Sequence, residues 1–130
     1  MVLIDTDIFI WILRDREDII DSFNTTAVET KGFIYTTPIQ VAEIYAGIRE
    51  NELTRTKEFI ESFILISLDY SIGENAGLYM KQFSKSHGIT LADALIASAV
   101  RKNAIKLWTL NRKHYPMLAP GEFWETGSDK

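Results

Sequence analysis

The sequence predicts an α/β fold in which a mainly parallel central sheet lies between two layers of helices. Short apolar runs alternate with longer segments whose apolar residues recur at helical spacing. The first run, 2–4, contains only Val, Leu and Ile, a composition typical of a parallel strand buried on both faces. We therefore expect a three-layer α/β/α sandwich formed by one domain over 1–130, with a loosely ordered tail at about 125–130.

Four strands and six helices are expected along the chain. The strands are the apolar runs 2–4, 33–36, 64–68 and 106–109. The helices are the segments 8–13, 15–30, 37–50, 53–63, 71–87 and 91–103. Several ends carry recognisable signals. Gly32 and Gly88 follow helices as C-terminal stops, while Thr37 and Thr90 are N-caps, the former followed by proline.

Composition excludes several kinds of site. The chain has no cysteine, which excludes disulfides, thiolate zinc sites and thiol nucleophiles. Its two histidines, His87 and His114, stand apart in the sequence, so a histidine-based zinc site is not expected. We see no signal peptide, and no apolar run approaches the ~20 residues needed to cross a bilayer. A cytoplasmic protein without membrane contact is therefore expected.

The net charge of −4 gives the whole molecule no attractive field for nucleic acid. Binding to a nucleic acid would need a metal ion or a local basic patch. One candidate patch late in the chain comprises Arg101, Lys102, Lys106, Arg112 and Lys113. The alternative is that these charges form an ordinary solvated face.

Three carboxylates stand where a simple core would not place them. Asp5 ends the first strand, Glu43 lies opposite the broad apolar face of its helix, and Asp93 lies in a helix that is apolar nearly all round. Each has a simpler explanation. Asp5 could cap the next helix, Glu43 could face solvent, and Asp93 could complete a capping box with Thr90.

The expected topology would bring these acids together. In a parallel sheet, the carboxyl ends of strands and the N-termini of the helices that follow them lie at the same edge. Converging carboxylates repel each other unless they share a cation, and hard oxygen ligands select Mg²⁺ or Mn²⁺ over zinc.

Four segments, in this order and spacing, resemble the PIN-domain ribonucleases and, within them, the VapC-type toxins of prokaryotic toxin–antitoxin pairs. The matching segments are 3–7, 37–47, 91–97 and 109–115, so the resemblance covers essentially the whole chain. It implies a PIN-like fold, RNA as the substrate, a cognate antitoxin and a homodimer. The apolar residues Tyr45, Ile48, Leu53, Phe59 and Phe63 add to the expectation of a dimer, because they exceed what one small domain obviously needs inside.

The resemblance also implies roles for individual residues. Asp5 and Asp93 would hold Mg²⁺ most directly, with Mn²⁺ as a possible substitute, and Glu43 would bind the metal or orient the attacking water. Many members of the family carry a fourth acid after the last inner strand, where this chain has Asn111 and His114.

Further residues would support this acidic core. Asp7 stands where many members of the resembled family have a neutral residue, so the resemblance makes it a candidate for a compensating charge. Thr6 and Thr109 would offer hydroxyl groups near the site, or else serve only as local hydrogen-bonding residues. Arg112 and Lys113 should flank the acidic pocket and contact RNA phosphates.

Two other functions are compatible with parts of the sequence. The segment Asp5-Thr6-Asp7 matches the Asp-x-Asp signature of haloacid-dehalogenase-type phosphatases, with Asp5 as nucleophile and Asp7 as acid–base. The chain lacks that family's later lysine and paired-acid motif. A non-catalytic PIN binding module is the second alternative, favoured by the missing fourth acid.

Overall fold

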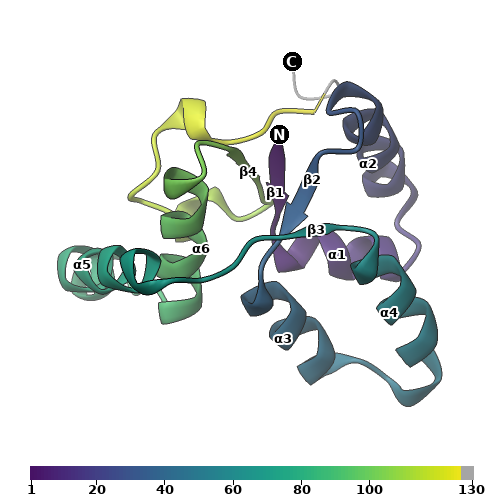
Figure 1. Cartoon of the computed structure of the whole chain (residues 1–130), viewed down its shortest axis with the longest axis horizontal. Coiled ribbons are helices and arrows are strands. Elements are labelled where there is room, and N and C mark those ends of the chain that lie inside the picture. The colour runs from purple at the N-terminus through teal and green to yellow at the C-terminus, as the bar shows by residue number, and fades with distance from the viewer. Residues whose placement is uncertain (127–130) are drawn as a thin grey trace.

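A four-stranded parallel sheet forms the centre of the computed structural model, which describes residues 1–126 (Figure 1). The strands lie in the order β3-β2-β1-β4. They are β1 (Val2–Ile4), β2 (Ile34–Thr36), β3 (Ile64–Leu65) and β4 (Lys106–Trp108). All three pairings are parallel, with Leu3 opposite both Tyr35 and Leu107. The predicted parallel sheet is confirmed.

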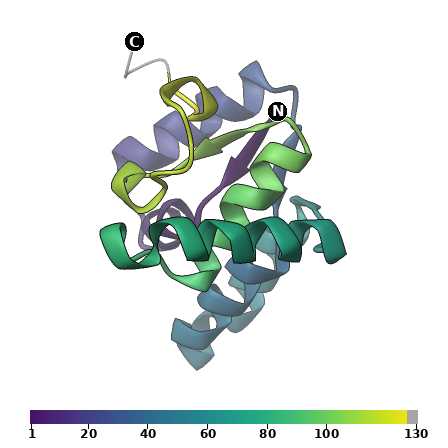
Figure 2. The same ribbon diagram turned by 90° about the vertical axis from the view of Figure 1, so that its left-hand side faces the viewer.

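Helices cover both faces of this sheet. One layer contains α5 (Tyr70–His87) and α6 (Leu91–Lys102), and Figure 2 shows α5 running across α6. The other layer contains α1 (Thr6–Leu13), α2 (Glu17–Glu29) and α4 (Leu53–Glu61). The helix α3 (Pro38–Gly47) lies near the carboxyl ends of the strands and contacts α1 and α6 (Figure 1). The predicted three-layer α/β/α sandwich is confirmed.

The strand β1 shows why the molecule needs two helical layers. Leu3 packs with α5 and α6 in one core cluster, whereas Val2 and Ile4 pack in the cluster on the opposite face. All three side chains are fully buried. An uninterrupted apolar run is the sequence that such a doubly covered strand requires.

Several element ends differ from the prediction. The helix α1 begins at Thr6 rather than at residue 8, because Asp5 is its N-cap and accepts a hydrogen bond from the Thr6 amide. Asp15, with φ 59°, separates α1 from α2, so α2 begins at Glu17 rather than at residue 15. The helix α3 ends at Gly47 rather than near residue 50, where a short 3₁₀ helix, η1 (Glu50–Glu52), follows.

The third strand is shorter than the expected 64–68. It comprises Ile64 and Leu65, which are both exposed because β3 is an edge strand. The Ile66 amide still donates to the Thr36 carbonyl, but the chain then leaves the sheet for α5. A short edge strand offers few unpaired backbone groups to another chain.

The segment after β4 is ordered against the domain. It includes the 3₁₀ helices η2 (Arg112–His114) and η3 (Pro120–Glu122). The Trp124 amide donates to the Leu107 carbonyl, which covers the outer edge of β4. Arg101 of α6 holds the same segment in place, because it donates to the Met117 carbonyl and forms an ion pair with Glu122.

The expected loose tail at about 125–130 is described by the structure as far as Thr126. Glu125 is exposed, and Thr126 is buried. The remaining part of that prediction, at 127–130, lies outside the described residues.

The apolar residues between 41 and 63 pack largely within the monomer. Phe59 and Phe63 form an aromatic cluster with Phe9 and Phe23, with ring centroids 4.7–5.9 Å apart. Tyr45 also packs against this core. Among the five residues cited for a homodimer, Leu53 is the exposed one. They therefore provide little support for a dimer, which stays a prediction.

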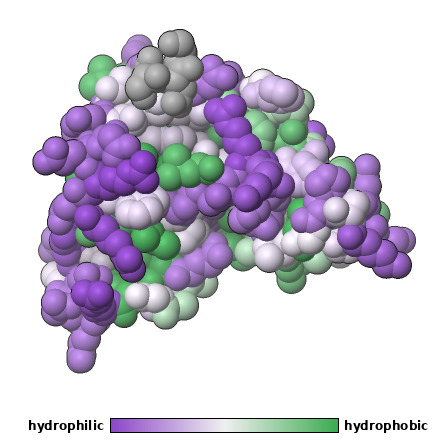
Figure 3. All heavy atoms as spheres, turned by 180° about the vertical axis from the view of Figure 1, so that it is seen from behind, coloured by the Kyte–Doolittle hydropathy of each residue, from purple (hydrophilic) through white to green (hydrophobic). Residues whose placement is uncertain are grey.

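The surface seen from behind is mainly hydrophilic, with apolar patches between the polar side chains (Figure 3). Large exposed apolar side chains include Val28, Tyr70, Leu65 and Leu91, on four different elements or their flanks. Within residues 1–126, none of the helices has the length and apolar character of a membrane span.

The ion pair between Arg101 and Glu122 allows a stability prediction. The Arg101 guanidinium lowers the pKa of Glu122 below its usual range. The charged carboxylate therefore stabilises the fold at pH values above the pKa of Glu122 in the unfolded chain. We expect Glu122→Gln to lower the free energy of unfolding at neutral pH by about 1 kcal/mol. The difference from wild type should shrink as the pH falls through the pKa of Glu122. Urea denaturation across this pH range measures it, and a pH-independent difference would contradict the prediction.

Candidate metal-binding acidic site

Asp5 occupies the carboxyl end of β1 and is fixed by three donors. Its Oδ1 accepts from the Thr6 amide at 2.8 Å, while its Oδ2 accepts from the Thr109 hydroxyl and the Tyr115 hydroxyl, each at 2.8 Å. The parallel register brings Thr109 here, because the Asp5 amide donates to the Trp108 carbonyl. The carboxylate is 8% exposed, so it is held in place by hydrogen bonds rather than by water.

Asp7 lies in the first turn of α1 and contacts the segment after β4. Its Oδ2 accepts from the Leu110 amide at 2.9 Å and from the Asn111 side chain at 3.0 Å. The Thr109 hydroxyl oxygen lies 3.4 Å away, but its proton makes the shorter bond to Asp5. Its Oδ1 is buried without a hydrogen-bond partner. A buried, partnerless carboxylate oxygen is costly unless something cationic compensates it.

Glu43 comes from α3 and approaches the same region through Thr6. The Thr6 hydroxyl donates to Glu43 Oε1 at 2.8 Å. The side chain is exposed, as the simpler explanation of its position required. Glu43 nevertheless contacts Thr6, which is next to Asp5 in the sequence. Its exposure to solvent is therefore compatible with a role in the acidic site.

Asp93 completes a capping box at the start of α6. Its amide donates to the Thr90 hydroxyl oxygen at 3.1 Å, and its Oδ2 accepts from the Thr90 amide at 3.2 Å. Asp93 therefore forms the expected capping box with Thr90. Asp93 also acts on the acidic site, because its charge raises the pKa of Asp5 and of Tyr115.

Burial and neighbouring carboxylates shift the pKa values of Asp5, Asp7 and the buried phenol of Tyr115. Burial raises the pKa of Asp5, against the opposing effect of its hydrogen bonds from Tyr115, Thr109 and Thr6. Burial and then the charge of Asp5 raise the pKa of Asp7 to about 6. Burial and the charges of Asp5, Asp93 and Asp7 raise the pKa of the Tyr115 phenol. The charges that shift these three groups belong to other carboxylates.

This set of donors fits a hard divalent cation. All of the candidate ligand atoms are carboxylate oxygens, which suit Mg²⁺ or Mn²⁺. A cation would also compensate the buried charge that Asp5 and Asp7 place in one region. Among residues 1–126, no three Asp, Glu or His side chains are grouped closely enough to form a ready metal site. Convergence of Asp5, Glu43 and Asp93 on one ion therefore stays a prediction.

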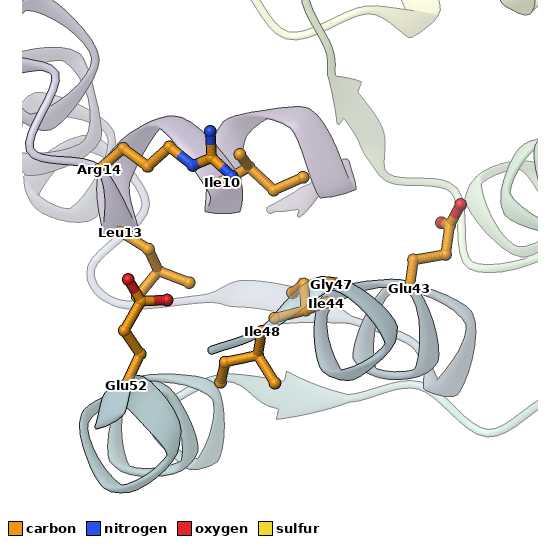
Figure 4. A pocket seen from close by; sticks show the side chains of 8 residues that line it. All are labelled: Ile10, Leu13, Arg14, Glu43, Ile44, Gly47, Ile48 and Glu52. Carbon is orange, nitrogen blue, oxygen red and sulfur yellow. The ribbon is translucent and has the colours of Figure 1, made fainter. Parts of the chain in front are cut away.

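An apolar groove begins beside Glu43 (Figure 4). Its wall contains Ile10 and Leu13 of α1 and Ile44 of α3, with Ile48 just beyond α3. Glu43 stands at one end, whereas Arg14 and Glu52 stand at the other (Figure 4). The groove thus connects a surface of mixed charge with the exposed member of the acidic group.

The proposed RNA-contacting cations lie on η2, directly after Asn111. Arg112 and Lys113 are both exposed. The Arg112 guanidinium lies 5.0 Å from the ring centroid of Phe123, a cation–π contact within the chain. Because Asn111 binds Asp7, both cations follow a residue that touches the acidic site.

Tyr115 is the site residue that we did not single out from sequence. Its phenol is 2% exposed and binds Asp5 across 110 residues of chain. The available signal was its place at the end of the segment 109–115, where a phenol follows a stretch of polar residues. That signal cannot distinguish a core tyrosine from a hydrogen-bond donor.

Comparison with known proteins identifies related sequences and structures. The family model described as "PIN domain" matches residues 2–117. Ribonuclease VapC10 of Mycobacterium tuberculosis is 30% identical over 118 residues, which cover 90% of this chain and 87% of that protein. A toxin–antitoxin complex from Klebsiella pneumoniae contains a chain with TM-score 0.75 and 22% identity, covering 93% of this chain and 94% of that one. A DNA-bound VapBC from Salmonella typhimurium gives TM-score 0.75 and 18% identity, covering 95% and 96%.

The charge of Asp7 should lower the free energy of unfolding by a measurable amount. Its raised pKa means that the charged form destabilises the fold, so the free energy of unfolding should fall as the pH rises from about 4 to about 6. We expect Asp7→Asn to stabilise the metal-free protein by about 1–3 kcal/mol at neutral pH, and to remove this pH dependence. Urea denaturation in EDTA measures both effects.

The matched control is Asp21→Asn, which removes an exposed carboxylate from α2. This variant should leave both the stability and its pH dependence close to wild type. Equal stability of wild type and Asp7→Asn at neutral pH would contradict the assigned cost.

Proposed function

This chain belongs to the PIN-domain family, and from that membership and its acidic site we propose that it is a divalent-metal-dependent endoribonuclease that hydrolyses RNA phosphodiester bonds. The observation that carries the proposal is the buried carboxylate of Asp5 at the carboxyl end of β1, which is held by the Thr109 and Tyr115 hydroxyls and whose pKa is raised by burial and by the charge of Asp93. Its relative from Mycobacterium tuberculosis is itself named a ribonuclease.

The roles follow from how each acid is held. Asp5 and Asp93 would bind Mg²⁺, or Mn²⁺ in its place, and Glu43 would bind it or orient the attacking water. Bound Mg²⁺ would supply an activated water and neutralise charge on the phosphodiester. Glu43 is exposed and accepts one hydrogen bond from Thr6, so its carboxylate has capacity to accept a proton from water. The water oxygen would bond to phosphorus while a P–O bond to the leaving nucleotide breaks.

Asp7 is our candidate to replace the charge of the fourth acid, which this chain lacks after β4. This chain has Asn111 and His114 where many members of the family have a carboxylate. Asp7 binds Asn111 and the neighbouring Leu110 amide, so its charge lies beside that segment. We propose that Asp7 compensates for the absent acid, with Thr6 and Thr109 as hydroxyl groups that order the acids.

The partners follow from the same comparisons. Structural neighbours come from toxin–antitoxin complexes, which supports a cognate antitoxin for this chain. We therefore propose that it is the toxin of such a pair, with RNA as the substrate and a homodimer as the functional form.

The two alternatives are less well supported. Membership of the PIN-domain family over 2–117 argues against a haloacid-dehalogenase-type phosphatase. In addition, the chain lacks that family's later lysine and paired-acid motif. A non-catalytic binding module has no need of two buried carboxylates whose pKa values are raised by burial and by the charge of another acid, Asp93 for Asp5 and Asp5 for Asp7.

Replacing Asp93 tests the catalytic role against the capping role. Asp93→Asn keeps a side-chain oxygen for the cap but removes the charge, so we expect at least a ~100-fold loss of RNA cleavage with little loss of stability. Thr90→Ala is the matched control, because it breaks the same capping box and keeps the carboxylate. It should cost about 1 kcal/mol of stability and retain most activity.

The assay is turnover of single-stranded RNA with Mg²⁺ or Mn²⁺, compared with EDTA. Asp5→Asn should be inactive in the same assay. Wild-type cleavage that is unaffected by EDTA would refute the proposed chemistry, and an active Asp93→Asn would reduce Asp93 to a helix cap.

The basic residues of η2 give a separate test of RNA binding. The double variant Arg112→Ala, Lys113→Ala should weaken RNA binding and lower the slope of log affinity against log salt by up to about 1.4, at roughly 0.7 per phosphate contact. Metal binding should be unchanged. The control is Lys81→Ala, Lys85→Ala, which removes two exposed cations from α5. Fluorescence anisotropy across a salt series measures the slope, and equal slopes for the two variants would identify Arg112 and Lys113 as ordinary surface charges.

A further inference from the structure

The two oxygens of Asp5 are not equivalent. Its Oδ2 accepts from both the Thr109 and the Tyr115 hydroxyl, whereas Oδ1 accepts from the Thr6 amide alone. A carboxylate offers about two acceptor sites on each oxygen. The two hydroxyl groups therefore use the capacity of Oδ2, and Oδ1 retains one site for another partner.

Tyr115 is built rigidly into this position. Its ring belongs to the core cluster that contains Leu3, Ile96 and Leu107, and its backbone amide donates to the Arg112 carbonyl at 2.9 Å. Because the ring is buried and the backbone is fixed, the phenol oxygen cannot follow Asp5 into another rotamer without disturbing the core. The hydroxyl thus constrains Asp5 rather than adapting to it.

We propose that Tyr115 is a positioning residue, whose hydroxyl acts with that of Thr109 to present Asp5 to a divalent cation through Oδ1 alone. The inference rests on the proposed metal-dependent function and concerns how this chain tunes its metal ligand. Binding through one carboxylate oxygen favours Mg²⁺ and Mn²⁺, which prefer a compact octahedral arrangement of ligands. Ca²⁺, in contrast, readily binds both oxygens of a carboxylate. Tyr115 therefore affects metal selectivity as well as affinity.

The test is the removal of one oxygen atom by Tyr115→Phe. Isothermal titration with Mn²⁺ alone, and separately with Ca²⁺ alone, gives the two dissociation constants without RNA. We expect the Mn²⁺ constant to rise about tenfold, in the range found when a hydrogen-bond partner of a metal ligand is removed. The Ca²⁺ constant should change much less, so that the preference for Mn²⁺ over Ca²⁺ narrows.

Two further variants separate positioning from a general loss of structure. Tyr79→Phe removes a phenol hydroxyl that binds Arg101 instead of an acid of the site, and it should leave both constants unchanged. Thr109→Val removes the other donor to Oδ2 and should narrow the preference, while Thr109→Ser, which keeps the hydroxyl, should restore it. Melting temperatures in EDTA establish that each variant is folded during the titration.

The outcomes are distinguishable. If the Mn²⁺-to-Ca²⁺ preference of Tyr115→Phe equals that of wild type within about twofold, while Asp5→Asn abolishes binding, the positioning role is refuted and the metal site stands. If wild type binds neither ion, the proposed metal-dependent function fails, and the role of Tyr115 fails with it. A narrowed preference in both Tyr115→Phe and Thr109→Val supports the inference.

Discussion

The parallel pairing of β1 with β4 is the constraint on which the acidic site depends. It joins the first strand of the chain to the last, with Ile4 opposite Trp108 and the Asp5 amide bonded to the Trp108 carbonyl. Each strand therefore ends beside the other, and Asp5 meets the Thr109 hydroxyl across 104 residues. A shift of one residue in this register would turn Asp5 to the other face of the sheet. The apolar residues of β1, buried on both faces, oppose such a shift.

Burial gives the site both its charge crowding and its rigidity. Water would screen the carboxylates if they were exposed, and their mutual repulsion would be small. In this fold, Asp5 keeps its place because three donors offset part of the loss of hydration, whereas Asp7 retains one oxygen with no partner. The fold thus tolerates a local destabilisation at the edge where ligands of α/β proteins commonly bind. Stability comes from the two core clusters on either side of β1.

The sequence was sufficient to predict the layers and the four strands, because those depend on local patterns. It also singled out the acids, whose convergence on one metal ion stays a prediction. Asp5 stood out because it ends an apolar run, and Asp93 because its helix is apolar nearly all round. What could not be predicted depends on long-range contacts. Tyr115 reaches Asp5 only through the path of the chain after β4, and the aromatic residues of α4 find partners in α1 and α2 that make them core residues. The length of β3 likewise depends on its place at the edge of the sheet.

The capping box at Asp93 shows why structural and functional explanations of one residue need not compete. A carboxylate in the first turn of a helix is stabilised by the amide of the N-cap and by the helix dipole. Those interactions orient the side chain at low cost, before any ligand is present. Because α6 begins near the carboxyl edge of the sheet, the same carboxylate acts electrostatically on Asp5 and Tyr115. A residue that the fold already holds in place is a suitable metal ligand, since little of its side-chain freedom remains to be lost on binding.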